Sequence, residues 1–145
     1  MNGPNGFLSD LLVGYIDGKR WRVVEGFTYR LVQPDGVQYV EIGKGFITDF
    51  ASMPLNVIFR SPGGKWDKPA VVHDCVYKTG YVSVDGGPNK PVTRGEADAI
   101  FKEAMGVAGV NWLSKQIIYA GVRAGGWRAW AQHRKAEADG RPTAA

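Results

Sequence analysis

Hydrophobic and polar residues alternate along the first half of the chain, in the pattern of β-strands. Residues 21–32 and 37–50 are rich in β-branched and aromatic side chains, and Asp35-Gly36 between them is a hairpin signal. An apolar run before Asp17-Gly18 has the same character. The pattern predicts a small antiparallel sheet of two or three strands between residues 20 and 50, with one further edge strand before it.

The second half of the chain has the period of α-helices. Asp67 is a suitable N-cap residue, and the apolar positions that follow predict a helix over residues 68–79 that stops at a glycine. Thr93 and Glu96 have the spacing of a capping box. A second helix is therefore expected to begin there and to close at Gly106.

A third helix is expected over residues 111–124, with a continuation beyond the Gly-Gly pair that follows. Residues 81–92 are rich in turn formers and predict a small hairpin. Residues 135–145 are small and polar and are expected to form a mobile tail. These elements predict an α+β fold, with a small N-terminal antiparallel β-sheet followed by about three C-terminal α-helices, in a single domain over residues 1–134.

Composition supports one domain and restricts the kinds of site that it can hold. The chain has 145 residues, 44% of them hydrophobic, which is enough for one core. Its single cysteine excludes an intrachain disulfide and a zinc site built from several cysteines, and it is compatible with a reducing compartment. No apolar run reaches the roughly twenty residues of a membrane span, and the first residues lack the features of a signal peptide. Synthesis as a soluble protein in the cytoplasm is expected.

The positive charge is concentrated at the C-terminal end. The net charge is +4, and residues 111–145 hold six basic and two acidic side chains, whereas the first 110 residues hold twelve of each. Residues 112–135 combine five Lys or Arg with three tryptophans and contain no acid. Such a segment could contact an anionic lipid surface, a protein or a phosphate backbone, although no known nucleic-acid-binding motif accompanies it.

Much of the third helix is nonetheless expected to pack on the core. Four apolar residues recur at helical spacing, and two more widen the stripe that they form. The four are Leu113, Ile117, Ala120 and Ala124, and the two are Trp112 and Ile118. The Arg and Trp side chains that follow, within residues 125–135, are then the expected contact surface.

The helix over residues 68–79 carries one narrow polar stripe. His73, Asp74 and Tyr77 share a face with Ala70, at spacings of three, four and seven, and the other faces are apolar. The stripe is therefore expected to point into a cavity or a buried polar seam. Asp98, on the flank of the second helix, is placed to reach His73 and to accept a hydrogen bond from Tyr77, which would leave Asp74 free.

This arrangement has two interpretations, and the residues leave both open. A histidine oriented by a carboxylate is a general base, and a separate carboxylate can hold a divalent cation, so the stripe could hydrolyse an ester. Alternatively, His73 is a core residue that ties helix to sheet, for which Asp49 is a second candidate partner. Asp49 with Asp74 could also bind a metal, although one histidine makes a zinc site unusual. Ser52 is expected to cap a turn, and Cys75 to lie in the core.

The stretch "DKPAVVHDCVY" resembles the active-site helix of secreted phospholipases A2 and their parvoviral relatives, and "EADAIF" resembles their later helix. The resemblance implies that His73 is the base, Asp74 a calcium ligand, Asp98 the carboxylate that orients His73, and Tyr77 the hydrogen-bond partner of Asp98. It covers roughly 35 residues. This chain lacks the family's glycine-rich calcium loop at its expected distance before the histidine, and it lacks the family's disulfides. The strand-rich first half of this chain has no counterpart in the family.

A second resemblance covers most of the chain. "GFITDFASMP", "AVVHDCVYKTG" and "RGEADAIFKEAM", followed by a Trp-rich helix, are similar to a family of short phage-encoded proteins with no assigned function. This resemblance implies a phage or prophage origin and says almost nothing about activity. Two functions are therefore expected: a hydrolase acting on a lipid or other envelope ester through the His-Asp site, or a non-enzymatic tail or baseplate accessory. Residues 112–135 would bind phage structural proteins or bacterial envelope lipid, and the protein would be made in the host cytoplasm and could enter the virion.

Overall fold

Strands fill the first part of the chain and helices most of the rest in the computed structural model, which describes residues 5–17, 20–48, 65, 67–85 and 87–140. The strands are β1 (Gly6–Phe7), β2 (Leu12–Asp17), β3 (Arg20–Glu25), β4 (Phe27–Gln33), β5 (Gly36–Ile42), β6 (Ile47–Thr48), β7 (Tyr81–Val84) and β8 (Lys90–Pro91). The helices are α2 (Asp67–Thr79), α3 (Arg94–Ala108), α4 (Trp112–Gly125) and α5 (Trp127–Ala138). The expected α+β class is confirmed.

The strands form two antiparallel sheets instead of one. The larger has the order β1-β4-β5-β7-β8 and the smaller the order β2-β3-β6. The β4–β5 hairpin lies where it was predicted. Its two loop residues are Pro34 and Asp35, and Gly36, which begins β5 and pairs with Gln33, has a φ of 140° that favours glycine. The chain passes from one sheet to the other at Gly26, where a Cβ atom would lie 2.8 Å from the Ile42 carbonyl oxygen. Only glycine allows this close approach.

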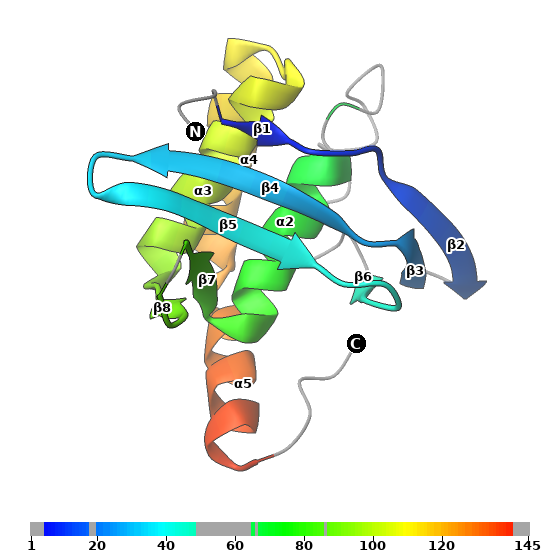
Figure 1. Ribbon diagram of the computed structural model, residues 1–145, viewed down its shortest axis with the longest axis vertical. Helices are drawn as coiled ribbons and strands as arrows, with labels where there is room; N and C mark the ends of the chain where they lie inside the picture. The colour runs from blue at the N-terminus through cyan, green and yellow to red at the C-terminus, as the bar shows by residue number, and fades with distance from the viewer. Residues whose placement is uncertain (1–4, 18–19, 49–64, 66, 86, 141–145) are drawn as a thin grey trace.

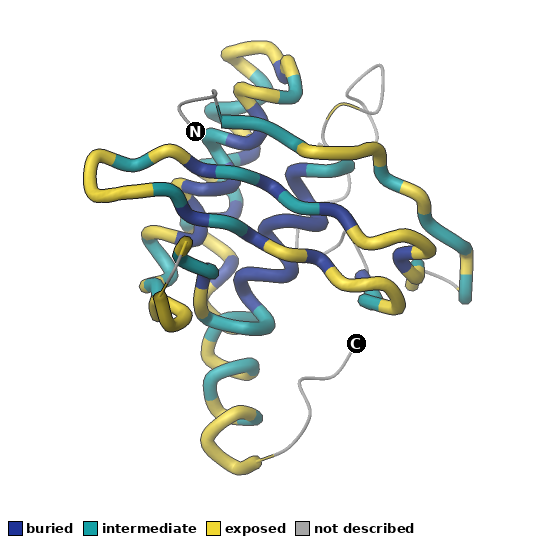
Figure 2. Tube along the Cα trace, viewed as in Figure 1, coloured by how far each residue is buried: buried dark blue, intermediate teal, exposed yellow. Residues whose placement is uncertain are grey.

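Helices cover one face of the larger sheet (Figure 1). Phe27, Tyr29 and Leu31 alternate along β4 and are buried, as are Val40 and Ile42 on β5, and Figure 2 shows the burial changing along both strands. α2 packs on β5 and on α3, while α4 contacts α3 and α5 contacts α2. The core therefore lies between the sheet and α2 and α3, with α4 and α5 beyond them.

The helix ends follow local sequence signals. α2 stops at Gly80, whose φ of 76° lies in the left-handed region. α3 begins with the predicted capping box, in which the Thr93 hydroxyl accepts from the Glu96 backbone and the Glu96 side chain accepts from the Thr93 backbone. Its expected end at Gly106 is wrong, because the helix continues to Gly109, the residue that adopts a φ of 87°.

The expected packing of α4 is wrong for most of its apolar stripe. Ile118 and Val122 are buried against α3, whereas Trp112, Leu113 and Ile117 are 69%, 62% and 49% exposed. Ala120 and Ala124 are also exposed. The helix carries two apolar stripes, and periodicity alone does not tell which of them packs on the core. The wider stripe faces solvent.

α5 extends below the rest of the molecule in Figure 1 and is anchored by its inner side. Its Trp130 ring packs edge-on against Tyr77, with centroids 5.3 Å apart. The Arg134 guanidinium donates to the carbonyl oxygens of Tyr77 and Lys78, at the C-terminal end of α2. The helix includes residues 135–138, which the sequence had assigned to the tail. No helix among the described residues is long and apolar enough to span a membrane.

Candidate functional site

The His73 and Asp98 side chains meet between α2 and α3. His73 lies in the middle of α2, and Asp98 lies in the second turn of α3, beyond its capping box. The His73 Nε2 atom is 2.8 Å from the Asp98 Oδ1 atom. The contact expected from the polar stripe of α2 is therefore present.

Tyr77 completes the contact on the same carboxylate oxygen. Its hydroxyl donates to Asp98 Oδ1 over 2.6 Å. The His73 ring also contacts two aromatic rings, with centroid distances of 4.1 Å to Tyr77 and 4.6 Å to Phe101. Because ring contacts and a hydrogen bond act together, the imidazole has one defined position.

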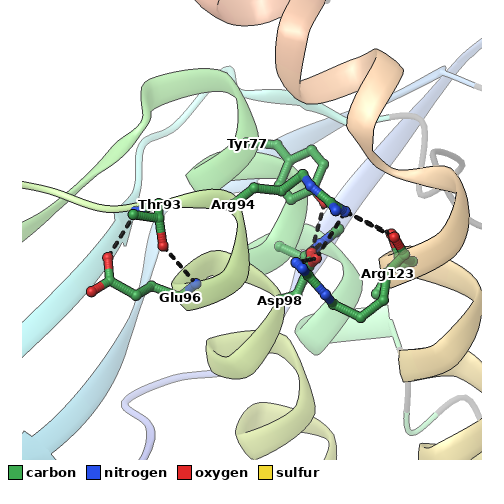
Figure 3. Close-up of polar contacts among 8 residues, drawn as sticks. Tyr77, Thr93, Arg94, Glu96, Asp98 and Arg123 are labelled. Atoms are coloured by element: carbon green, nitrogen blue, oxygen red, sulfur yellow. Dashed lines mark hydrogen bonds and ion pairs between the residues drawn. The ribbon is translucent and has the colours of Figure 1, made fainter.

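Two arginines bind the other oxygen of Asp98, and neither was predicted from the sequence. Arg123 Nη1, from α4, lies 2.8 Å from Asp98 Oδ2, and Arg94 Nη1 lies 3.3 Å from it (Figure 3). Arg94 Nη1 also donates to the carbonyl oxygens of Val122 and Arg123 near the end of α4. Arg94 could have been found from its i,i+4 spacing to Asp98, but nothing local identifies Arg123.

The carboxylate is charged and the imidazole is neutral. Burial would raise the pKa of Asp98, but hydrogen bonds led by that from His73 outweigh it, and the pKa lies below the usual value. Burial lowers the pKa of His73, and the opposing hydrogen bond to Asp98 does not cancel the effect. An ionised carboxylate only accepts hydrogen bonds, so the proton of the neutral ring is on Nε2. Arg94 and Arg123 supply the balancing positive charge.

The centre of the network is enclosed by protein. His73 is 2% exposed and Asp98 is fully buried. Arg94 and Arg123 reach it from partly exposed positions. Solvent therefore contacts the outer arginines more readily than the imidazole.

Asp74 is not free, contrary to the expectation. Its Oδ2 atom lies 3.8 Å from Lys78 Nζ, one turn further along α2; Asp74 is buried and the Lys78 side chain is 9% exposed. Lys78 Nζ also donates to the Ile47 carbonyl oxygen over 2.6 Å and lies over the Phe46 ring. Asp74 and Lys78 together tie α2 to β6 and to the segment before it.

Asp74, the expected calcium ligand, has the Lys78 ammonium 3.8 Å from its carboxylate. A calcium ion, which takes six to eight oxygen ligands, would have to displace this ammonium. Among the residues that the structure describes, no three His, Cys, Asp or Glu side chains are grouped so that they could hold a metal ion. Asp49 and Ser52, the other residues considered for this site, lie outside the described residues.

A known protein family matches more than half of the chain. The model of a family described as "Protein of unknown function (DUF1353)" matches residues 21–122. The chain belongs to this family. No curated protein and no solved structure matches the chain.

The DUF1353 match includes most of the network. It contains His73, Tyr77, Arg94 and Asp98, and it ends one residue before Arg123. The expected membership in a family of unassigned function is thereby confirmed, while the phage origin and the phospholipase likeness stay predictions.

Cys75 is a core residue of this DUF1353 chain, as expected. It is buried, and its thiol faces the Glu41 carbonyl oxygen at 3.8 Å. Burial, with a smaller effect from Asp74, raises the pKa of the thiol to about 12. The thiolate that a nucleophile requires is therefore disfavoured.

The network in the DUF1353 chain has two chemical capacities. A neutral imidazole with its proton on Nε2, held by a carboxylate, is the form in which histidine acts as a general base. The same carboxylate accepts hydrogen bonds from three helices, through His73 and Tyr77 on α2, Arg94 on α3 and Arg123 on α4. Burial of both His73 and Asp98 favours the second capacity, in which the carboxylate holds the helices together. This network is called here the polar lock, and it consists of His73, Tyr77, Arg94, Asp98 and Arg123.

Proposed function

We propose that this chain is a non-enzymatic interaction protein of a phage particle, of the tail or baseplate accessory type, that binds its neighbours through α4 and α5. The observation that carries the proposal is the outward apolar face of α4, called here the α4 face: Trp112, Leu113, Ile117, Ala120 and Ala124. Contiguous exposed apolar surface of this kind marks interaction sites.

The polar lock supports this function because it fixes the α4 face in position. Arg123 projects from α4 to the Asp98 carboxylate, and Arg94 binds backbone carbonyls near the end of the same helix. These contacts hold the inward side of α4 against α3 and leave the α4 face outward. A partner therefore meets a surface that is already ordered, which lowers the entropic cost of binding.

α5 adds exposed positive charge after the end of α4. Trp127, Arg128 and Lys135 are exposed, and the Arg128 guanidinium lies over the Trp127 ring. Trp130 does not belong to this surface, because its ring packs on Tyr77. An acidic protein neighbour or an anionic envelope lipid would complement this end of the molecule.

A second candidate function is hydrolysis of a lipid or other envelope ester. The His73–Asp98–Tyr77 geometry favours it, because it matches the roles that the phospholipase resemblance implies. Nδ1 of the neutral His73 would accept the proton of the attacking water, while Asp98 stabilises the imidazolium that forms. Calcium, if bound, would polarise the ester carbonyl; Asp74 would have to exchange Lys78 for the ion.

Phage production by matched variants separates the two functions. Leu113→Glu places a charge on the α4 face, whereas His73→Gln keeps an amide donor near the position of Nε2 but cannot accept a proton. If binding is the function, Leu113→Glu loses most of the infectious yield and the chain is depleted from purified particles, while His73→Gln retains both. Leu8→Glu, at a site that is equally exposed (60%), is the control and is expected to change neither.

The opposite pattern would contradict the binding function. Loss of yield in His73→Gln, with normal yield in Leu113→Glu, would show that the imidazole and not the α4 face is required. The hydrolase also requires that the unmodified protein release fatty acid from phospholipid vesicles in a calcium-dependent reaction, and that His73→Gln abolish it. Melting temperatures of all variants show whether each is folded.

A further inference from the structure

Four residues of the α4 face have the spacing of a helix-pairing surface. Leu113, Ile117, Ala120 and Ala124 are separated by four, three and four residues, which is the alternation found where two helices pack side by side. All four are exposed in a single copy of the chain. None of them is charged, and depletion of charge is characteristic of the core of protein interfaces.

Side-chain size changes in one direction along this face. The large residues, Leu113 and Ile117, occupy its N-terminal half, and the small residues, Ala120 and Ala124, occupy its C-terminal half. A helix with the opposite taper would pack against it at an even distance, because large side chains would face small ones along the whole contact. The same helix, turned end to end, has this opposite taper.

We propose that the partner of the α4 face is a second copy of this chain, bound through an antiparallel α4–α4 contact with twofold symmetry. Leu113 of one copy then lies against Ala124 of the other, and Ile117 lies against Ala120. The contact is self-complementary, as a twofold interface requires. This inference rests on the proposed binding function and names its partner.

A lipid surface is the main competitor for the same face, and the alanines argue against it. An interfacial helix gains affinity from the apolar area that it buries, so bulky residues are favoured at every outward position. Ala120 and Ala124 bury little area in lipid, but they let another helix approach closely. Size and spacing together therefore favour a helix as the occupant.

The contact is limited to one pair of helix faces. Small interfaces are typical of weak, transient association, so we expect a dissociation constant in the micromolar range or weaker. Sedimentation equilibrium should show a mass that rises with concentration from the 15.8 kDa of one chain toward twice that value. Ile117→Glu should weaken the association at least about 100-fold, because each interface would bury two unpaired charges. Leu8→Glu should leave it unchanged.

Cysteine crosslinking tests the direction of the two helices. Positions 113 and 124 are eleven residues apart, about 16 Å along a helix, whereas a disulfide joins Cα atoms within about 7 Å. In the antiparallel contact, Leu113→Cys and Ala124→Cys proteins do not crosslink by themselves but form a disulfide dimer when mixed. The only natural cysteine, Cys75, is buried and does not compete.

Three outcomes would overturn the inference. A single-chain mass at all concentrations up to the solubility limit excludes the dimer, and this leaves the binding function intact if Leu113→Glu still loses phage yield. Self-crosslinking of each single cysteine variant without crosslinking of the mixture indicates a parallel contact. Binding of the monomer to anionic lipid vesicles, lost in Ile117→Glu, assigns the α4 face to lipid instead.

Discussion

Replacing Asp98 with asparagine is expected to lower the free energy of unfolding by about 3 kcal/mol. The carboxylate is fully buried and accepts hydrogen bonds on both oxygens. An asparagine has the same shape, but its amide nitrogen donates and would face either the two arginines or His73 and Tyr77. One set of donors therefore loses its acceptor, and the positive charge of Arg94 and Arg123 loses its counter-charge.

Urea unfolding followed by circular dichroism measures this loss, and the melting temperature should fall by about 6–12 °C. Asp10→Asn is the matched control. The Asp10 side chain is fully exposed, and its contact with Lys68 is a surface ion pair, so the change should stay within about 0.5 kcal/mol. A loss below 1 kcal/mol for Asp98→Asn would show that the network does not lock the helices.

Gly126→Ala is expected to destabilise the protein by about 1–3 kcal/mol, the usual cost of forcing extra volume into a packed site. Gly126 joins α4 to α5 and is buried against α2. A Cβ atom there would lie 2.4 Å from the Tyr77 hydroxyl oxygen and 2.6 Å from the Val122 carbonyl oxygen. The added methyl group would therefore displace Tyr77 from Asp98 or move α5 away from α2.

The neighbouring glycine supplies the control for this substitution. A Cβ atom at Gly125 would meet no atom within 4 Å, and the residue is helical. Gly125→Ala should therefore be neutral or stabilise the protein by up to about 1 kcal/mol, because alanine favours the helix. Equal effects of the two substitutions in the same thermal unfolding experiment would contradict the close contact between the α4–α5 junction and Tyr77.

The parts of the site that sequence could predict depend on local spacing. His73, Asp74 and Tyr77 share one face of α2 because helical periodicity places them there, and the Thr93 capping box sets the start of α3. With these two helices in place, Asp98 was one of the two candidate partners of His73, beside Asp49. The β4–β5 hairpin is equally local, since Gly36, directly after its two loop residues, has a φ of 140° that favours glycine.

The parts that sequence could not predict depend on how helices meet in space. α4 has two apolar stripes, and α3 accepts the one with Ile118 and Val122, which leaves the stripe with Leu113 outward. Arg123 reaches Asp98 only because α4 has this orientation. The expectation that Asp74 stays free failed for a simpler reason: Lys78 lies one turn away on the same helix and its ammonium is 3.8 Å from the Asp74 carboxylate.

The central claim is that His73 is an enclosed, neutral part of a helix lock. Because an unfolded chain would protonate His73 near pH 6.5 and the folded chain does so only at lower pH, the folded state must lose stability as the pH falls below about 6.5. The imidazole proton on Nε2, bound to Asp98 and shielded from water, should also exchange slowly with solvent.

An NMR titration of the imidazole nitrogens measures both properties directly. The chain has two histidines, so His133→Gln leaves the His73 signals alone in the spectrum. A locked His73 should be neutral at pH 7, carry its proton on Nε2, protonate well below pH 6.5 and show a proton signal that persists in water. A midpoint near pH 6.5 with rapid proton exchange would contradict the lock and would place His73 within reach of water and substrate.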